Sequence, residues 1–301
     1  MNNLQLNKKV SIIIPTYNSI KTIEYCLKSV INQSYSNIEV IIIDGHSSDG
    51  TIEWLEHNLP NECIFIKTKK GVSLQRNKGI EVANGDYLTF IDSDDCIDKN
   101  YILNLVLNIG NCDIAIPTLK SFEYVEDIPN NVKKIHYTNI NNHDFFYGGH
   151  SSCLISPFKL YKRHIIDNIR FKEDVHYAED LLFNYEIFKN KHPLYSLISN
   201  SIYYYRTLPD INPASKRLYK CTLSFFKYLI AIYKNEKNTY LLNIIYENYI
   251  LFIKEFIYHK HYTPIEFFKV KIFLLFNYKK IIKKLVILFP RLYFCKQRLK
   301  N

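Results

Sequence analysis

Short apolar runs alternate with segments of helical periodicity over the first 116 residues of the chain. The runs are rich in Ile and Val, which is typical of buried strands, and between them apolar residues recur every three or four positions, as in helices. This alternation favours a mainly parallel sheet with helices on both faces. It predicts strands at 10–14, 38–43, 63–66, 87–91 and 113–116, and helices near 20–31, 50–55, 74–83 and 101–107.

The rest of the chain forms two further regions. From 117 to 210 the pattern is less regular and indicates antiparallel strands, with one clear helix that begins near Glu179. Beyond this region the pattern turns helical and is dense in Tyr, Phe, Ile and Lys. We therefore expect an α/β domain over 8–210, divided at 116, and a helical region over 211–301.

Polar residues follow three of the predicted strands directly. These groups are Pro15–Asn18, Asp44–Asp49 and Asp92–Asp95. In open α/β sheets, ligands bind beyond the carboxyl ends of the strands. The sequence therefore predicts a binding site at this edge of the sheet.

The group Asp92-Ser93-Asp94-Asp95 is the strongest chemical signal. Three carboxylates within four residues repel one another unless a cation neutralises them. Carboxylates suit Mg²⁺ or Mn²⁺, which in turn hold phosphate oxygens. An acidic loop that caps a helix is the alternative, and the position at a strand end favours the metal.

The group that follows the second strand holds two further candidates. Asp44 ends the strand, where its carboxylate would accept hydrogen bonds from a ribose or a base. Asp49 stands where it would cap the next helix, as Ser19 would cap the first. For Asp49, capping and ligand contact are equally consistent with the sequence.

The chain has a net charge of +10 that is concentrated near its end. From residue 216 onward there are 18 Lys and Arg against 4 Glu, whereas the first 215 residues carry 21 basic and 25 acidic groups. Because the region with the polar groups is acidic and holds no nucleic-acid motif, a nucleic-acid-binding protein is disfavoured. Segment 264–301 interleaves Lys with apolar residues, which fits either a helix on an anionic membrane or internal packing.

The cysteine pattern and the apolar runs indicate the cellular compartment of the protein. Seven widely spaced cysteines without a CxxC pair indicate reduced thiols rather than a zinc site or a disulfide framework. No run approaches the roughly 20 residues of a membrane-spanning helix, and the N-terminus shows no signal-peptide pattern. We expect a cytoplasmic protein, peripheral at the inner face of the cell membrane.

The segments VSIIIPTYN, IEVIIIDGHSSDGT, RNKGI, GDYLTFIDSDD and AEDLLF occur in this order. Together they resemble family 2 glycosyltransferases of the bacterial cell-surface polysaccharide type, which have the glycosyltransferase A-type fold. The resemblance is close over about the first 110 residues and resumes at AEDLLF. It implies that 8–116 binds the nucleotide and that 117–210 faces the acceptor.

The resemblance implies roles for the residues at the nucleotide. Pro15, Thr16 and Asn18 would lie near a uracil, and Asp44 would contact the nucleoside. Arg76 would lie near the nucleotide, with Asn77 and Gly79 shaping a turn beside it. Asp92 and Asp94 match the DxD pair, Asp94 being the expected ligand of Mn²⁺ or Mg²⁺ and Asp95 supporting it. The family commonly has DDGS where this chain has DGHS, and an exposed loop His is the better interpretation of His46.

The resemblance also implies a mechanism. Asp180 would act as general base, Glu179 would orient the acceptor, and the sugar would be displaced directly with inversion. His150 would line the acceptor side or be structural. The expected donor is a nucleotide-sugar, a UDP-sugar by resemblance, and the acceptor is a hydroxyl of a saccharide or lipid-linked saccharide. The enzyme would then be a hexosyl- or N-acetylhexosaminyl-transferase.

Two further classes stay open as alternatives. A catalytically inactive relative that serves as a scaffold is disfavoured by the intact DxD and ED pairs. A dinucleotide-dependent oxidoreductase would share the sheet, but no GxGxxG follows the first strand.

Overall fold

The computed structural model describes residues 7–122, 157–176, 179–206 and 228. The chain divides into two units, Met1–Lys216 and Arg217–Asn301, and all the elements below belong to the first. His150 and the segment 264–301 lie outside the described residues.

The helices are α1 (Ile23–Ile31), α2 (Thr51–Asn58), α3 (Val72–Val82), α4 (Tyr101–Asn108), α7 (Arg163–Ile166) and α8 (Glu179–Lys191). The strands are β1 (Val10–Thr16), β2 (Ile38–Asp44), β3 (Ile64–Lys67), β4 (Tyr87–Phe90), β5 (Cys96–Ile97), β6 (Ile114–Phe122), β7 (Leu160–Lys162) and β8 (Tyr195–Arg206).

The strands form one mixed sheet in the order β3-β2-β1-β4-β7-β6-β8-β5. The predicted parallel arrangement is confirmed for β1 to β4, which pair in parallel. Strand β7 then lies between β4 and β6 and runs antiparallel to both. The strand predicted at 113–116, β6, therefore runs in the direction of β4 but does not pair with it. The antiparallel expectation for 117–210 is only partly right, because β8 pairs with β6 in parallel.

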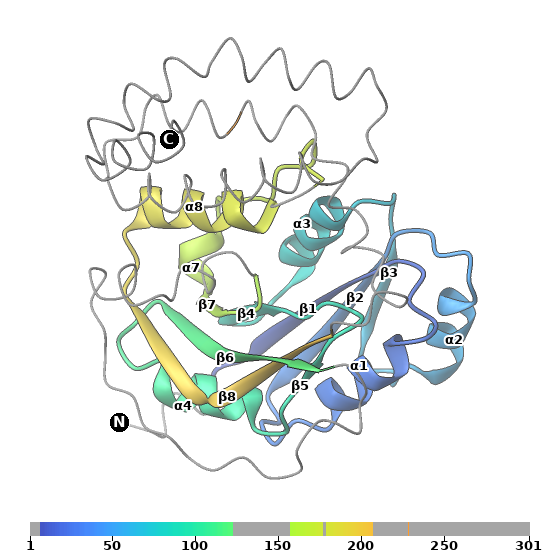
Figure 1. The fold of residues 1–301 in the computed structure, drawn as a ribbon, viewed down its shortest axis with the longest axis horizontal. Coiled ribbons are helices and arrows are strands. Elements are labelled where there is room, and N and C mark those ends of the chain that lie inside the picture. The colour runs from blue at the N-terminus through green and yellow to red at the C-terminus, as the bar shows by residue number, and fades with distance from the viewer. Residues whose placement is uncertain (1–6, 123–156, 177–178, 207–227, 229–301) are drawn as a thin grey trace, which may run out of the picture. The chain divides into compact units, whose positions relative to one another are not determined.

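Helices cover both faces of the sheet, as predicted. Val10, Ile12 and Ile14 of β1 belong to a core that includes the apolar faces of α1 and α4. The opposite side of β1 faces α3, where a Cβ at Gly79 would lie 2.3 Å from Cγ2 of Ile13, so only glycine allows this close approach. Figure 1 shows α3, α7 and α8 together on one side of the sheet. Strands buried on both faces explain the continuous apolar runs in the sequence.

An aromatic cluster joins α8 to the sheet. The Phe90 ring of β4 makes edge contacts with Phe171 and Phe183, whose rings stack with centroids 3.9 Å apart. Such pairs contribute about 0.5–1.5 kcal/mol each beyond the area they bury. The cluster holds the first turn of α8 against the carboxyl end of β4.

The ends of the helices correct two local predictions. Helix α1 begins at Ile23 with Thr22 as its N-cap, so Ser19 does not cap it through its side chain. Asp49 does satisfy the start of α2, because its Oδ1 accepts the backbone N–H of Thr51 at 3.1 Å. Its Oδ2 accepts the N–H of Ile20 at 3.1 Å, so Asp49 also links two loops. The N-cap of α2 is nevertheless Gly50, so Asp49 precedes the cap and supports the first N–H group of the helix from there.

Candidate functional site

The loops after β1 and β2 meet at the edge of the sheet, as the sequence predicts. Thr16 and Asp44 are neighbours in the strand register, and the N–H of Gly45 donates to the carbonyl of Thr16 at 2.9 Å. The fully buried carboxylate of Asp44 accepts the N–H of Ser47 at 2.8 Å and its hydroxyl at 2.6 Å. Contact between Asp44 and a nucleoside stays a prediction, because the hydrogen bonds shown hold its own loop.

Asn18 ties the two loops together. It adopts a left-handed backbone with φ of 50°, which Asn tolerates better than most residues. Its N–H donates to the Ser47 hydroxyl at 2.8 Å, and its side-chain oxygen accepts the N–H of Ser48 at 2.9 Å. Pro15 is buried within β1, which extends through Thr16 rather than ending at Pro15. His46 is exposed, in agreement with the expectation for it.

Arg76 is the centre of the charged network. Its guanidinium donates to Asp92 through Nη2 and to Glu179 through Nη1, both at 2.8 Å. Its side chain is only 4% exposed. Burial lowers the pKa of this guanidinium, but the charges of Asp92 and Glu179 outweigh that effect and raise the pKa above its ordinary value. Arg76 therefore remains a cation and joins the DxD segment to the ED pair.

Replacing Arg76 with methionine should lower the free energy of unfolding by up to about 3–5 kcal/mol, the range for breaking a buried ion pair. The partial exposure of Asp92, 33%, keeps the loss from exceeding this range because water can solvate that carboxylate. Urea unfolding measures the change. Lys78→Met in the same helix is the control, since its pair with Glu81 is exposed and contributes less than about 1 kcal/mol. Equal losses in both variants would contradict the central position of Arg76.

The Asp92–Asp95 segment is held in place by β8. The Tyr203 hydroxyl accepts the N–H of Asp92 at 3.1 Å and donates to Asp95 Oδ2 at 2.7 Å. Arg206 donates its N–H to Asp95 Oδ1 and its Nε–H to the carbonyl of Asp94, both at 2.8 Å. Asp95 is 1% exposed. It therefore fastens the loop to the sheet.

Burial and mutual repulsion disfavour the charged forms of the carboxylates in this segment. Burial, and then the charge of Asp92, raise the pKa of Asp94 well above its usual range. Burial and the charges of Asp94 and Asp92 likewise raise the pKa of Asp95. A nearby divalent cation would reverse these shifts, because it favours the charged form of each carboxylate.

The donor set fits a metal that is shared with a substrate. Among residues 7–122, 157–176 and 179–206, no three His, Cys, Asp or Glu side chains converge on one point as a complete metal site. Mg²⁺ commonly takes one or two protein carboxylates and completes its shell with waters and substrate phosphates. Asp92 and Asp94 meet that requirement.

The ED pair opens α8, as the sequence predicts. Oδ1 of Asp180 accepts the N–H of Leu181 at 2.7 Å. Burial, and then the charge of Glu179, raise the pKa of Asp180 to about 7, while the charge of Arg76 lowers it. The residue as a whole is intermediate in exposure. A carboxylate with such a pKa suits proton transfer near neutral pH.

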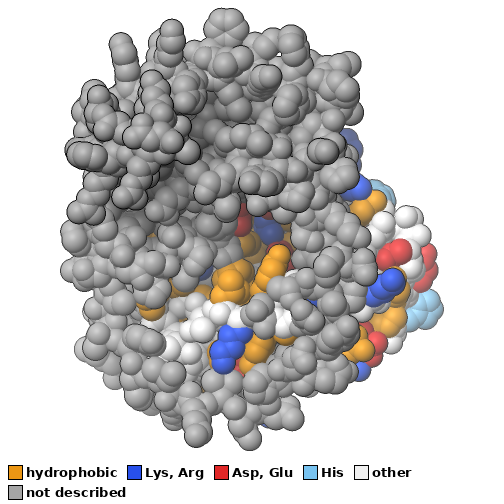
Figure 2. Space-filling view, in the orientation of Figure 1, with side chains coloured by type: hydrophobic (Ala, Val, Ile, Leu, Met, Phe, Trp, Pro, Cys, Tyr) orange, Lys and Arg blue, Asp and Glu red, His pale blue; other side chains and the backbone are white. Residues whose placement is uncertain are grey.

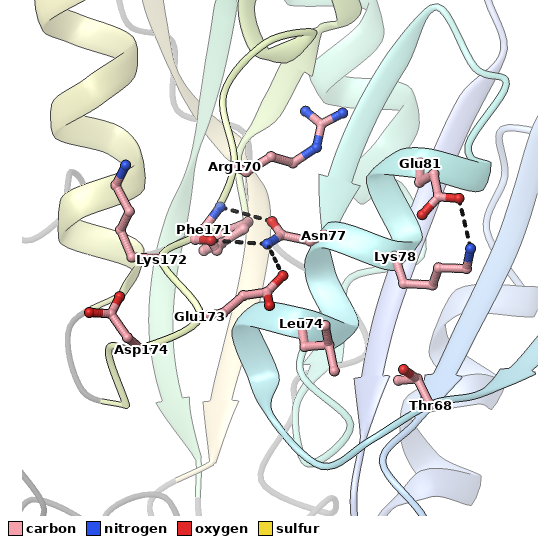
Figure 3. A pocket seen from close by; sticks show the side chains of 10 residues that line it. All are labelled: Thr68, Leu74, Asn77, Lys78, Glu81, Arg170, Phe171, Lys172, Glu173 and Asp174. Atoms are coloured by element: carbon pink, nitrogen blue, oxygen red, sulfur yellow. Dashed lines mark hydrogen bonds and ion pairs between the residues drawn. The ribbon is translucent and has the colours of Figure 1, made fainter.

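Asn77 and Gly79 lie inside α3 and not in a turn, which corrects the sequence-based expectation. The Asn77 side chain accepts the N–H of Phe171 at 2.8 Å and donates to its carbonyl at 2.9 Å, as Figure 3 shows. It also donates to Glu173 at 3.1 Å. Asn77 thereby anchors the segment that leads into α8.

A pocket of about 410 Å³ lies between α3 and this segment (Figure 3). Charged side chains dominate its lining, among them Lys78, Glu81, Arg170 and Glu173. None of the predicted catalytic or metal-binding carboxylates lines it. Acidic and basic side chains also lie together near the centre of the face in Figure 2. The candidate site is therefore defined by the carboxylates and Arg76 rather than by this pocket.

Three side chains of the site were missed in the sequence. Tyr203 and Arg206 belong to a Tyr-rich strand, and nothing in that run distinguishes them from core residues. Gln75 precedes Arg76, and its amide donates to the carbonyls of Thr16 and Ile43. The position of Gln75 beside the RNKG segment was the one available signal for it.

Comparison with known proteins finds relatives in sequence and in fold. Glycosyltransferase GlyA of Streptococcus pneumoniae is 30% identical over 181 residues, which cover 55% of this chain and 26% of GlyA. The structure of Staphylococcus aureus TarS 1–349 in complex with UDP-GlcNAc superposes with a TM-score of 0.60 at 22% identity, covering 79% of this chain and 71% of that one. Mannosyltransferase PcManGT from Pyrobaculum calidifontis, in complex with GDP-Man and Mn²⁺, gives 0.55 at 17% identity and covers 79% and 68% of the two chains. The solved structures show that the fold is shared.

The family assignment rests on the sequence match and on the site together. Residues 11–170 match the family described as Glycosyl transferase family 2. This range contains the loops after β1 and β2, Arg76 and the Asp92–Asp95 segment. The chain belongs to glycosyl transferase family 2.

Proposed function

We propose that this protein transfers a sugar, with inversion, from a nucleotide-sugar to a hydroxyl group of a cell-surface or lipid-linked saccharide. The observation that carries the proposal is the pair of ion pairs from Arg76 to Asp92 and Glu179. It brings the carboxylates expected at the diphosphate next to those expected at the acceptor. The structure of TarS 1–349 with UDP-GlcNAc supports a UDP-sugar as donor and N-acetylhexosamine as one candidate sugar.

Each residue of the candidate site has a role that follows from its position. The loops holding Asn18 and Asp44 receive the nucleoside, and Asp92 and Asp94 face the diphosphate. Mn²⁺ or Mg²⁺ held by Asp92 and Asp94 would neutralise the charge on the departing diphosphate, and the Mn²⁺ complex of PcManGT supports this choice. Asp180 takes the proton from the acceptor hydroxyl as the anomeric carbon is attacked. Glu179, held by Arg76, orients the acceptor.

The scaffold alternative is less consistent with the charges. Asp94 and Asp180 have raised pKa values, which means that each carboxylate is costly in its charged form. Perturbed groups that converge at a ligand edge are typical of active sites. A scaffold protein would not require carboxylates whose charged forms are destabilised by their surroundings.

Contact with an anionic membrane through 264–301 stays a prediction, as does the location at the inner face of the cell membrane. In the part of the chain that the structure describes, no helix has the length and apolarity needed to span a bilayer.

A panel of nucleotide-sugars, each with and without Mn²⁺, tests the proposed donor. A ligand that binds only the folded state raises its stability by about 2.7 kcal/mol at 100 times its Kd. We expect UDP-sugars with Mn²⁺ to raise the midpoint of thermal unfolding by several degrees, and UDP-sugars without metal to raise it less. GDP-sugars serve as the matched comparison. A flat response across the whole panel would contradict the proposed function.

A further inference from the structure

Gln75 braces the end of the sheet where the nucleoside is expected. The residue lies in α3 and is 3% exposed. Its Nε2 donates to the carbonyl of Thr16 at 2.6 Å and to the carbonyl of Ile43 at 2.7 Å. These carbonyls belong to the neighbouring strands β1 and β2. One side-chain amide therefore bridges the two strands near their carboxyl ends, at Thr16 of the last register pair and Ile43 of the pair before it.

The Gln75 amide is linked through a shared carbonyl to a loop of the candidate site. The carbonyl of Thr16 also accepts the N–H of Gly45, the residue that follows β2. Asp44 and Ser47, which form the hydrogen-bonded loop described above, flank Gly45. Movement of the amide would thus change the spacing between the end of β1 and this loop.

Gly45 provides the space that Gln75 occupies. A Cβ at Gly45 would lie 3.3 Å from both Cδ and Nε2 of Gln75 and 3.2 Å from Cα of Lys70. Optimal contacts between carbon atoms lie at about 3.5–4.0 Å, so a side chain at this position would push against the amide. An aspartate there, with three more heavy atoms than Cβ, would displace it. The small residue after β2 and the buried glutamine therefore form a matched pair.

The segment after β3 also contacts the residues near Gly45. The ammonium group of Lys70 lies 4.0 Å from the centroid of the Tyr17 ring, a cation–π contact. Tyr17 follows β1, and Lys70 follows β3. The ends of three parallel strands thus converge around Gly45 and Gln75.

We propose that Gln75 is a positioning residue that, with Gly45, shapes the pocket for the nucleoside part of the donor. The inference rests on the proposed function, because it takes the ligand to be a nucleoside diphosphate. It assigns Gln75 to the nucleoside and not to the phosphates, which are expected at Asp92 and Asp94. Gln75 acts through the strand ends and the loop of Asp44.

The test compares two ligands that differ only in the nucleoside. UDP and inorganic pyrophosphate are titrated with Mn²⁺ into the full chain by calorimetry. Gln75→Met keeps the length of the side chain but removes both donors. The strand ends and the Asp44 loop then lose their link to α3, and UDP binding should weaken by about tenfold or more. Pyrophosphate binding should stay within about twofold of the unchanged protein. Gln75→Glu, which turns an oxygen toward the two carbonyls, should weaken UDP binding at least as much.

Gly45→Asp and its combination with Gln75→Ala test the matched pair. The single variant should weaken UDP binding by about tenfold. The double variant should also weaken UDP binding by about tenfold and not by the product of the two separate losses, because both substitutions disturb the same contact. Gln33→Met is the control, since its amide bridges the carbonyls of Ser29 and Asp98 in the same way, outside the candidate site. It should lower stability without changing UDP affinity.

The outcomes separate the inference from the proposed function. If the unchanged protein binds no nucleotide with Mn²⁺, the proposed function fails. If it binds UDP and Gln75→Met binds UDP equally well, the inference fails and the proposed function stands. Equal weakening of UDP and pyrophosphate would also overturn the inference, because it would indicate a general structural role.

Discussion

Replacing Asp180 with asparagine is expected to lower kcat by about 10²–10⁴, the range that a general base contributes. The amide keeps the shape of the side chain, and its oxygen still accepts the N–H of Leu181. The fold and the donor site should therefore survive. Steady-state kinetics measure kcat, and calorimetry measures donor affinity, which should change by less than about threefold.

The pH profile gives a second test of Asp180. Its pKa of about 7 means that the carboxylate is half protonated near neutral pH. A base works only when deprotonated, so kcat should rise with pH, reach half its maximum near pH 7 and fall about tenfold per unit below that. Asp167→Asn changes an exposed carboxylate at the end of α7 and should keep the profile of the unchanged protein. A profile without any rise through neutral pH, or loss of donor binding equal to the loss of kcat, would contradict the role of base.

Replacing Asp94 with asparagine is expected to abolish the response to metal while leaving the fold intact. Loss of the charge stabilisation that a metal supplies, worth several kcal/mol, corresponds to a decrease in kcat of about 10³ or more. Without metal, the variant should be as stable as the unchanged protein or more so. The reason is that burial and the charge of Asp92 already disfavour a charged Asp94.

Asp95→Asn is the matched comparison, one residue away. Asp95 accepts hydrogen bonds from Tyr203 and from the backbone of Arg206, so its loss should disturb β8 and lower stability by about 1–3 kcal/mol. Thermal unfolding with and without Mn²⁺ and UDP distinguishes the two variants. Retention of the full Mn²⁺ response by Asp94→Asn would show that the metal assignment is wrong.

Local patterns were sufficient for the elements that surround the site. The apolar runs of β1, β2 and β4 are buried on both faces, so each is recognisable without its neighbours. Strand β8 was not located, because its pairing with β6 joins residues far apart in the sequence. Its polar positions Ser196, Asn200 and Ser201 also interrupt any simple alternation.

The candidate carboxylates were found for a similar reason. Asp92 and Asp94 follow a buried strand directly, and charged residues there are conspicuous against an apolar background. The roles of their neighbours were not accessible in this way. Asp95 looks like another member of the acidic group, and only its contacts with Tyr203 and Arg206 show that it holds the loop.

By itself, the sequence determined the α/β class, the four parallel strands and the sheet edge that carries Asp44, Asp92 and Asp94. These features follow from short apolar runs and from the polar residues directly after them, which can be recognised within a few neighbouring positions. The tertiary structure alone decided that Arg76 joins Asp92 to Glu179 and that Gln75 bridges β1 and β2. These contacts join residues that are far apart in the sequence, so they depend on how the helices and strands pack. Their energies come from burial and from hydrogen-bond geometry, which exist only once the sheet and its helices have packed.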